Sequence, residues 1–550
     1  MKKTFEFLTS YCVDGLFYTI KGLSCDHFDI TLSEREEVIK VTINPKAKIS
    51  HLKINMECVH LYNPQTRVFV NGYQSWTDSK EFFIDEKMPR IRGCAKLLPT
   101  LKAYGDENFV KYSPFKGVFH GFTYGYTRDL NKVCLFGSMS ERNGYTIITF
   151  NSRKNCVSIT KELEGVEITK PYEVFDLGYF EGEYDEVFDR YFSLQNLPAL
   201  KIKNATGYTS WYNYYTNVKK ANIIQDLNSF EGKNISIDFF QIDDGYQTQV
   251  GDWLSIKPDF GDMKEVADLI HSKKIKAGLW LAPFACTRKS KIYKEHKDWL
   301  LVDSKGRKVK GGNNWDPLGF YVLDILKPQV QDYLKEVFDV VLNKWGFDMV
   351  KLDFLYATCM IPRQNKSRGQ IMCEAMDFLR ECVGNKLILG CGVPLGPSFG
   401  KVDLCRIGCD VGLRWHPNMF EKYLHRERVS TINGINNSIF RRHLNGKAFV
   451  NDPDVFFLRD YNIKMNEEQR LILADVNKLF GGVLFVSDNI ATYTNQNLKR
   501  LEDLLKHDDI EIVSAEYITK SLISIEYNIN GIESQELVFD IENGVIVRDW

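Results

Sequence analysis

The sequence carries almost no excess of charge of either sign. Its 550 residues include 71 Lys and Arg against 72 Asp and Glu, so the formal net charge is -1. A chain without a strong net field has no long-range attraction for nucleic acid or for an anionic membrane surface. We therefore expect neither of these as a partner.

Long apolar runs are also missing. No stretch approaches the about 18 consecutive apolar residues that a membrane-spanning helix needs, so no such helix is expected. The chain begins with two lysines, but Glu6 and Asp14 interrupt the apolar core that an export signal would require. The sequence predicts a protein that is not exported.

The cysteines lack the spacing of a metal site or of a disulfide framework. There are 13 of them, an odd number, and no two form a Cys-x-x-Cys pattern. Scattered thiols of this kind are typical of reduced cytoplasmic proteins. We therefore expect a cytoplasmic protein.

The length and the composition indicate a globular protein of several domains. A chain of 550 residues is too long for one hydrophobic core and suggests two to four domains. Aromatic residues make up 13%, which is compatible with sugar-stacking surfaces or simply with large cores.

Both ends of the chain have β patterns. Residues 1–200 contain short alternating segments such as YTIITFNS and YEVFDLGYF, separated by polar or glycine-containing turns, which predict a large antiparallel β domain. Residues 493–550 alternate in the same way around Asn530-Gly531 and Asn543-Gly544, and Asn-Gly between strands is typical of hairpins. A small C-terminal β domain is expected there.

Residues 201–492 alternate between short apolar strands and amphipathic helices. The clearest helix spans 328–345, with Pro328 in its first turn. Eight strands with helices between them predict a (β/α)8 TIM barrel. The strand candidates are 206–211, 237–244, 277–284, 348–354, 387–392, 404–410, 448–454 and 483–489.

Two segments depart from a regular repeat. Residues 393–403 are too few, and too rich in Gly and Pro, for a full helix. Residues 285–320 form a long polar insertion after the third strand, where loops often face a substrate.

The fourth strand, DMVKLDFLYA, carries an unexpected pair of charges. Side chains alternate along a strand, so Lys351 and Asp353 should point to one face while Val350, Leu352 and Phe354 point to the other. The pair is either a buried ion pair or part of a site.

Other polar residues also follow the predicted strands. In a (β/α)8 barrel the carboxyl ends of the strands converge on one mouth, where active sites lie. Several carboxylates there would repel one another unless a substrate or a metal required them. The residues in question are Asp243, Asp244, Lys351, Asp353, Cys391, Arg406, Asp410, Asp452 and Asp454.

Each of these residues also has a purely structural interpretation. IDDGY and NDPD are compatible with ordinary turns. Arg406 and Asp410, four apart on a strand, could form a salt bridge, and Cys391 could be a small buried hydrophobe. The case for a site depends on all of them converging.

Two chemistries use such a mouth. One is glycoside hydrolysis with retention, which needs one ionised and one protonated carboxyl group. The other is a lyase or isomerase that holds a divalent metal on carboxylates and uses a lysine as base. Trp211, Trp253 and Trp280 would supply apolar faces for a sugar ring, which favours the first. A barrel that binds carbohydrate without catalysis is a third alternative, and the presence of both carboxylates speaks against it.

Six ordered motifs resemble the α-galactosidases of glycoside hydrolase family 36, in particular the compact bacterial type. They are GYTSWYNYY, FFQIDDGYQ with GDW, GLWLAPF, VKLDFLYA, LGCGVPLGPSFGKVDLCRIGCDV and NDPDVFFLR, and VNGYQSW at 70–76 resembles the N-terminal motif of that family. The resemblance implies an N-terminal β-supersandwich (1–200), a catalytic (β/α)8 barrel (201–492) and a C-terminal antiparallel β-sandwich (493–550).

The resemblance also implies roles for the polar residues. Asp353 would be the nucleophile and Asp410 the general acid/base. Asp243 and Asp244 would bind the O4 and O6 region of galactose, where an ionised carboxylate can accept hydrogen bonds from hydroxyl groups. Lys351 would donate to ring hydroxyls and keep Asp353 ionised.

Five further residues would complete the site. Arg406 and Cys391 would lie near O2, and Trp280 and Trp211 would shape the pocket. Trp76 would reach from the N-terminal domain over the barrel mouth, the alternative being a core position in its own domain. Two positions depart from the family pattern: Thr209 stands where Cys is common, and Cys409 where Pro is common.

The implied activity is hydrolysis of terminal, non-reducing α-galactosyl residues from oligosaccharides such as melibiose or raffinose. No cofactor and no metal is implied, and a homo-oligomer is left open. The alternatives are an α-N-acetylgalactosaminidase or a galactosyl-transferring enzyme of the same fold and, more remotely, the metal-dependent lyase.

Overall fold

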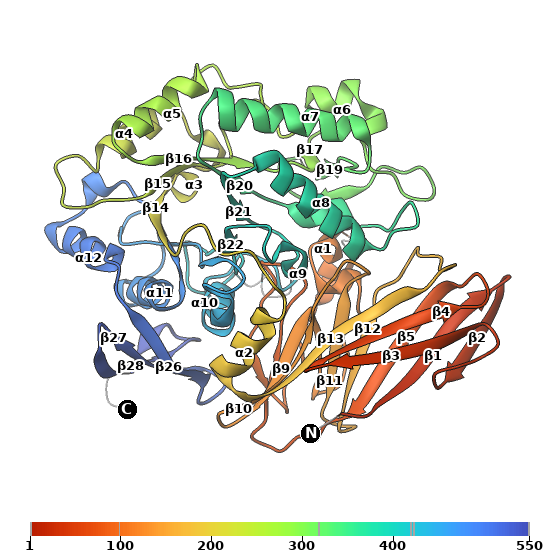
Figure 1. Ribbon diagram of the computed structural model, residues 1–550. Helices are drawn as coiled ribbons and strands as arrows, with labels where there is room; N and C mark the ends of the chain where they lie inside the picture. The colour runs from red at the N-terminus through yellow and green to blue at the C-terminus, as the bar shows by residue number, and fades with distance from the viewer. Residues whose placement is uncertain (1–2, 98–99, 317–318, 419–420, 422–423, 548–550) are drawn as a thin grey trace.

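The structure is a computed structural model that describes residues 3–97, 100–316, 319–418, 421 and 424–547 (Figure 1). None of the helices within these ranges is long and apolar enough to cross a membrane. The cysteines that the structure describes in full are all free thiols.

Two antiparallel sheets form the N-terminal part of the molecule. In β5, Leu52, Ile54 and Met56 are buried and alternate with residues that face outward, as the period of two predicts. The first sheet, in the order β2-β1-β5-β12-β11-β8, contains β1 (Phe5–Val13), β2 (Leu16–Lys21), β5 (Ser50–Val59), β8 (Val118–Phe122), β11 (Thr146–Asn151) and β12 (Cys156–Lys161). The second, in the order β3-β4-β13-β10-β9-β6-β7, contains β3 (Phe28–Arg35), β4 (Val38–Pro45), β6 (Arg67–Val70), β7 (Glu81–Phe83), β9 (Tyr124–Asp129), β10 (Lys132–Ser138) and β13 (Tyr172–Glu183).

A parallel sheet forms the centre of the molecule. Its order is β23-β22-β21-β20-β16-β15-β14-β25-β24, and its two ends, β23 and β24, follow one another in the chain with only Pro453 and Asp454 between them. The sheet therefore curls round so that its ends meet, which fits a TIM barrel. Its strands are β14 (Ala205–Thr209), β15 (Phe239–Ile242), β16 (Lys276–Leu281), β20 (Met349–Leu352), β21 (Leu387–Gly390), β22 (Leu404–Arg406), β23 (Val450–Asp452), β24 (Val455–Phe456) and β25 (Val483–Val486).

Each predicted strand range overlaps an observed strand, but the strands end earlier than expected. Trp211 was expected on the first strand and instead begins the short helix α3 (Trp211–Tyr214). Asp410 was expected on the same strand as Arg406, and that strand ends at Arg406.

The expected orientation of Phe354 is wrong. Alternation holds only while the backbone stays extended, and here the strand ends at Leu352. Phe354 has a φ of +53°, in the left-handed region, so the chain turns and its ring faces the same cavity as Lys351 and Asp353.

Helices separate most of the central strands. The predicted helix at 328–345 is confirmed: α7 (Pro328–Asp339) starts with Pro328 and continues as a π-helical turn to Lys344. The short connection at 393–403 holds only one helical turn, α9 (Leu395–Ser398). The others are α4 (Lys220–Asn228), α5 (Met263–Ser272), α8 (Arg368–Val383), α10 (Thr431–Phe440), α11 (Glu467–Phe480) and α12 (Asn495–Leu505).

The insertion after the third barrel strand has a small sheet of its own. It is formed by β17 (Ala285–Cys286), β18 (Lys310–Gly312) and β19 (Phe320–Val322), with helix α6 (Lys291–Glu295) between the first two. Backbone pairing therefore joins three described stretches of this part of the chain.

The C-terminal sheet contains the predicted hairpins. Asn530 and Gly531 both have positive φ, at +51° and +76°, as a two-residue turn between paired antiparallel strands requires. Its strands are β26 (Ile510–Tyr517), β27 (Leu522–Ile529), β28 (Ile532–Asp540) and β29 (Val545–Ile546). It lies against the barrel, where Trp415 Nε1 donates to the Ile541 carbonyl at 2.8 Å.

The second N-terminal sheet shares a hydrophobic core with the barrel, while a separate buried cluster lies between the two N-terminal sheets. Phe69 and Tyr124 from the second sheet belong to the same buried cluster as Trp280 and Leu352 from the barrel. Helix α2 (Tyr184–Ser193) lies between them (Figure 1). This shared core holds the N-terminal part against the mouth of the barrel.

Candidate active site

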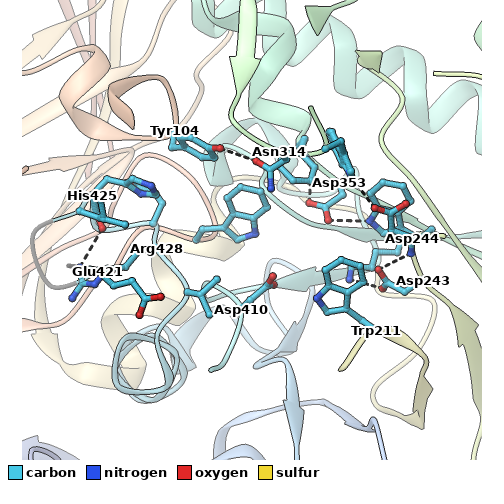
Figure 2. Close-up of a pocket in the computed structure, with 18 residues that line it drawn as sticks. Tyr104, Trp211, Asp243, Asp244, Asn314, Asp353, Asp410, Glu421, His425 and Arg428 are labelled. Atoms are coloured by element: carbon cyan, nitrogen blue, oxygen red, sulfur yellow. Dashed lines mark hydrogen bonds and ion pairs between the residues drawn. The ribbon is translucent and has the colours of Figure 1, made fainter. Parts of the chain in front are cut away.

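A cavity of about 290 Å³ opens at the carboxyl ends of the barrel strands (Figure 2). Of the ten residues predicted from the sequence, eight line it: Trp76, Trp211, Asp243, Asp244, Trp280, Lys351, Asp353 and Asp410. The other two, Cys391 and Arg406, lie directly behind the lining and bond to Trp76 and to Asp410 respectively.

Asp353 is held by two donors. The Trp280 indole donates to its Oδ2 at 3.0 Å, and the backbone N–H of Phe354 donates to its Oδ1 at 2.8 Å. Burial raises the pKa of Asp353 above its ordinary value, while the charge of Lys351 and the bond from Trp280 act in the opposite direction. The carboxylate is therefore fixed in direction and partly compensated in charge.

Lys351 forms its ion pair with Asp243 instead of with Asp353. Its Nζ lies 2.8 Å from Asp243 Oδ2, and both side chains are buried. Burial alone would lower the pKa of Lys351, but the Asp243 carboxylate outweighs it and holds the pKa above the ordinary value. The two residues come from different strands, whose inward-pointing side chains meet inside the barrel.

Thr209, one of the two departures from the family pattern, lies beside Asp243. The Thr209 hydroxyl accepts from Gln241 Nε2 at 2.9 Å and lies 3.4 Å from Asp243 Oδ2. The other departure, Cys409, is buried, and its thiol lies 3.5 Å from the Ser430 carbonyl. Both substitutions therefore keep a polar contact.

Asp244 has two donors and no cation within ion-pair distance among the described residues. Gln247 Nε2 donates to its Oδ1 at 2.6 Å, and Trp315 Nε1 donates to its Oδ2 at 2.7 Å. Burial raises its pKa to about 6, and the neighbouring Asp243 charge adds to the shift. Trp315 lies in the insertion that was predicted to face a substrate.

Asp410 is held by Arg406, and this ion pair confirms one of the open alternatives. Arg406 Nη1 lies 2.8 Å from Asp410 Oδ1. The same guanidinium reaches Asp452 at 3.3 Å and Asp454 at 2.8 Å, so one cation serves three carboxyl groups. Burial raises the pKa of Asp454 to about 6.

Trp76 lies between the N-terminal domain and the barrel. Its indole Nε1 donates to Cys391 Sγ at 3.3 Å, and its ring packs edge-on against Phe354 at a centroid distance of 5.0 Å. A Cβ at Gly392, whose φ is +52°, would be only 2.8 Å from the ring. Trp76 therefore faces barrel residues rather than the core of its own domain.

Trp253 lies behind the cavity. It is fully buried, and its ring contacts Trp280 edge-on with centroids 5.8 Å apart. It therefore supports Trp280 and does not itself face the cavity, contrary to the expectation from the sequence.

Ten lining residues were not predicted individually. Asn314 and Trp315 come from the insertion, and His425 stacks on Tyr104 with ring centroids 4.8 Å apart. Figure 2 shows Glu421, His425 and Arg428 on one side of Asp410. Apart from Phe354, which lies in VKLDFLYA, these positions belong to none of the motifs recognised in the sequence, and only the insertion had been marked as substrate-facing. The ten are Tyr104, Asn314, Trp315, Phe354, Glu421, Leu424, His425, Glu427, Arg428 and Val429.

The arrangement can carry out chemistry at an acetal carbon. It contains two carboxyl groups in different surroundings, one buried and bonded by an indole and the other paired with a guanidinium. Aromatic rings form its walls. Within the described residues, no group of three or more His, Cys, Asp and Glu side chains is arranged to hold a metal ion.

Comparison with known proteins supports the same family. Residues 206–375 match the family model described as Melibiase. Alpha-galactosidase Mel36A of Lactobacillus acidophilus is 30% identical over 131 residues, which cover 22% of this chain and 17% of that protein. An A type blood alpha-D-galactosamine galactosaminidase of Flavonifractor plautii is 29% identical over 176 residues, covering 28% of this chain and 16% of that protein.

The fold similarity extends over nearly the whole chain. The structure of the Thermus thermophilus alpha-galactosidase TtGalA, in complex with p-nitrophenyl alpha-D-galactopyranoside, aligns with a TM-score of 0.74 at 22% identity, over 98% of this chain and 100% of that chain. The sequence alignments, by contrast, span less than a fifth of the length of the two curated relatives. The resemblance to the α-galactosidases of glycoside hydrolase family 36 is confirmed.

The raised pKa of Asp244 leads to a prediction about stability. Its pKa rises from 3.8 to about 6 on folding, so the stability linked to this group is present below 3.8 and lost as the pH rises through 6. Asp244→Asn removes the ionisation. Relative to wild type, we expect the unfolding free energy of the variant to increase by about 2–3 kcal/mol from about pH 4 to pH 7. Urea unfolding of both proteins at the two pH values measures this change.

Asp377→Asn is the control for this prediction. Asp377 lies on helix α8, outside the cavity, and its pKa is lowered on folding by hydrogen bonds from Arg142 and Lys401, which outweigh the opposing effect of burial. The stabilising contribution of Asp377 is lost as the pH falls. The unfolding free energy of the variant should therefore lie further below that of wild type at neutral pH than at acidic pH. The same pH trend in both variants would contradict the prediction.

Proposed function

We propose that the protein is a retaining, exo-acting α-galactosidase that removes terminal, non-reducing α-D-galactosyl residues from oligosaccharides such as melibiose or raffinose. The observation that carries the proposal is one cavity at the barrel mouth lined by both Asp353 and Asp410 and walled by tryptophans. The Melibiase match supports it, since residues 206–375 include Asp353. The relative named an alpha-galactosidase supports it as well.

The reaction would proceed by double displacement. Asp353 attacks the anomeric carbon and forms a covalent galactosyl ester, while Asp410 donates a proton to the departing glycosidic oxygen. Asp410 then takes a proton from water, which attacks the same carbon and breaks the bond to Asp353. The donors from Trp280 and Phe354 hold the Asp353 carboxylate in one orientation for the attack.

Selection of galactose would depend on the buried polar groups at the other end of the cavity. Asp243 and Asp244 would accept hydrogen bonds from the O4 and O6 hydroxyls, and Lys351, held by Asp243, would donate one to a ring hydroxyl. A sugar lacking a matching hydroxyl would leave these buried groups unpaired, which costs binding.

The remaining predicted residues would form the walls and the support of the site. Trp211 and Trp280 present their faces to the sugar ring, and Trp76 covers the side on which Cys391 lies. Arg406, whose guanidinium already bonds three carboxylates, would act chiefly by holding Asp410.

The finer architecture is part of the same proposal. We infer an N-terminal β-supersandwich over 1–200, a catalytic (β/α)8 barrel over 201–492 and a C-terminal β-sandwich over 493–550. The arrangement of the sheets supports this division, and the domain boundaries stay predictions. A cytoplasmic location also stays a prediction.

Asp353→Ala tests the nucleophile. Without the carboxylate no galactosyl ester can form, so we expect kcat for p-nitrophenyl α-galactoside to fall by at least about 10⁴-fold, measured by release of nitrophenolate. Asp377→Ala on helix α8, an ion-pair residue outside the cavity, should keep wild-type activity. Unchanged activity of the Asp353 variant would refute the assignment.

Asp410→Ala tests the acid/base. With an activated leaving group the galactosyl ester still forms, but water is no longer deprotonated and hydrolysis stalls. Azide needs no base: it forms a C1–N bond as the C1–O bond to Asp353 breaks. We expect azide to restore turnover at least tenfold and to yield α-galactosyl azide, identified by NMR. The β anomer would instead indicate a missing nucleophile.

An α-N-acetylgalactosaminidase is the second candidate, favoured by the relative named a galactosaminidase. Against it, Trp76 packs onto Gly392 beside Cys391, and with the O2 side of the sugar at Cys391, as proposed, the Trp76 ring would fill space that an acetamido group needs. We expect kcat/KM for the nitrophenyl α-galactoside to exceed that for the N-acetylgalactosaminide by about 100-fold, since a clash and unpaired polar groups both oppose binding. The reverse ratio would favour the second candidate.

A further inference from the structure

Arg441 is a fully buried arginine whose hydrogen-bond partners are all uncharged. It follows helix α10 directly, and no ion pair joins it to any carboxylate of the described residues. Burial lowers its pKa only to about 10, so it stays protonated at neutral pH. Its acceptors are Asn71 Oδ1 at 3.0 Å and the carbonyls of Ser75 at 2.6 Å, Ile407 at 2.7 Å, Gln74 at 3.3 Å and Gly72 at 3.4 Å.

These acceptors belong to two segments that carry residues of the cavity. Residues 71–75 come from the N-terminal domain and lead directly into Trp76. Ile407 comes from the barrel and lies between Arg406, which holds Asp410, and Asp410 itself. Nη1 donates to both segments at once, to the Ser75 carbonyl and to the Ile407 carbonyl. One nitrogen atom therefore joins the two segments.

Nearby contacts tie the same N-terminal segment to the barrel at other points. The Ser75 N–H donates to the Val393 carbonyl at 2.9 Å, and Ser79 N–H donates to Asn437 Oδ1 on helix α10 at 2.8 Å. Neither bond reaches the turn between Arg406 and Asp410. The bonds from Arg441, by contrast, connect Ser75, which precedes Trp76, with Ile407 in that turn.

We propose that Arg441 is a positioning residue that sets Trp76 and Asp410 relative to each other across the boundary between the N-terminal domain and the barrel. Its planar fork of donors is suited to this task, because it bonds several oxygens in fixed directions. A lysine keeps the charge but cannot span both segments with one rigid group. The effect on catalysis rests on the proposed function, whereas the effect on the two segments does not.

Hydrogen–deuterium exchange tests the structural part of the proposal directly. In Arg441→Lys we expect amides in both 71–76 and 407–411 to exchange at least tenfold faster than in wild type, because both segments lose the shared anchor. Arg368→Lys is the matched control: Arg368 is also buried and joins helix α8 to Glu162 and Glu164 of the N-terminal domain, away from the cavity. Faster exchange in neither segment, in only one of them, or equally in the control would overturn the proposal.

Kinetics with two substrates test the catalytic part. Raffinose has a poor leaving group that needs a proton from Asp410, whereas nitrophenolate leaves with little help. Arg441→Lys should therefore lower kcat/KM for raffinose at least tenfold more than for p-nitrophenyl α-galactoside, and Arg368→Lys should leave that ratio unchanged. An unchanged ratio in Arg441→Lys would overturn the catalytic part. If wild type cleaves neither substrate, the proposed function fails, while the exchange experiment still decides the role of Arg441.

Asn71→Ala provides a milder second variant in case Arg441→Lys does not fold. It removes one side-chain acceptor of Arg441 and leaves the backbone acceptors in place. We expect a smaller change in the same direction, both in exchange of the two segments and in the ratio of the two substrates. If exchange does not become faster in both segments of this variant, the proposal is overturned here as well.

Discussion

Repulsion among buried carboxyl groups at the barrel mouth is the constraint on which the rest of the site depends. Asp243, Asp353, Asp410, Asp452 and Asp454 meet there together with Asp244, and two buried cations, Lys351 and Arg406, compensate part of their charge. The pairing is unequal: Lys351 bonds Asp243, and Arg406 serves three carboxyl groups. Burial is the main cause of the raised pKa values of Asp244, Asp353 and Asp454, and the charges of neighbouring carboxyl groups add to each shift.

The N-terminal domain completes this mouth. Trp76 covers the side on which Cys391 lies, and Tyr104 stacks on His425 of the barrel. The hydrophobic core that the second N-terminal sheet shares with the barrel joins the two parts, and so do the hydrogen bonds of Arg441 to Ser75 and Ile407. The domain therefore contributes to the cavity wall as well as to stability.

Much of the fold could be predicted because its signals are local. Each of the eight predicted strand segments has a short apolar run, helix α7 has its period and its proline, and Asn530-Gly531 marks its hairpin. The prediction failed where the backbone leaves the extended form. Phe354 turns toward the cavity through a left-handed residue, and Trp211 starts a helix instead of ending a strand. Neither change leaves a periodic signal in the sequence.

The sequence by itself determined the chemistry of the mouth, since the barrel topology places the residues that follow each strand at one end. Seven of the predicted residues that line the cavity lie on or follow barrel strands, and the eighth, Trp76, comes from the N-terminal part of the chain. Only the tertiary structure decided which groups are partners. Lys351 bonds Asp243, 108 positions away, and Trp76 bonds Cys391, 315 positions away. Such choices depend on distances of a few ångströms between side chains of separate strands and domains, and spacing along the chain carries no information about them.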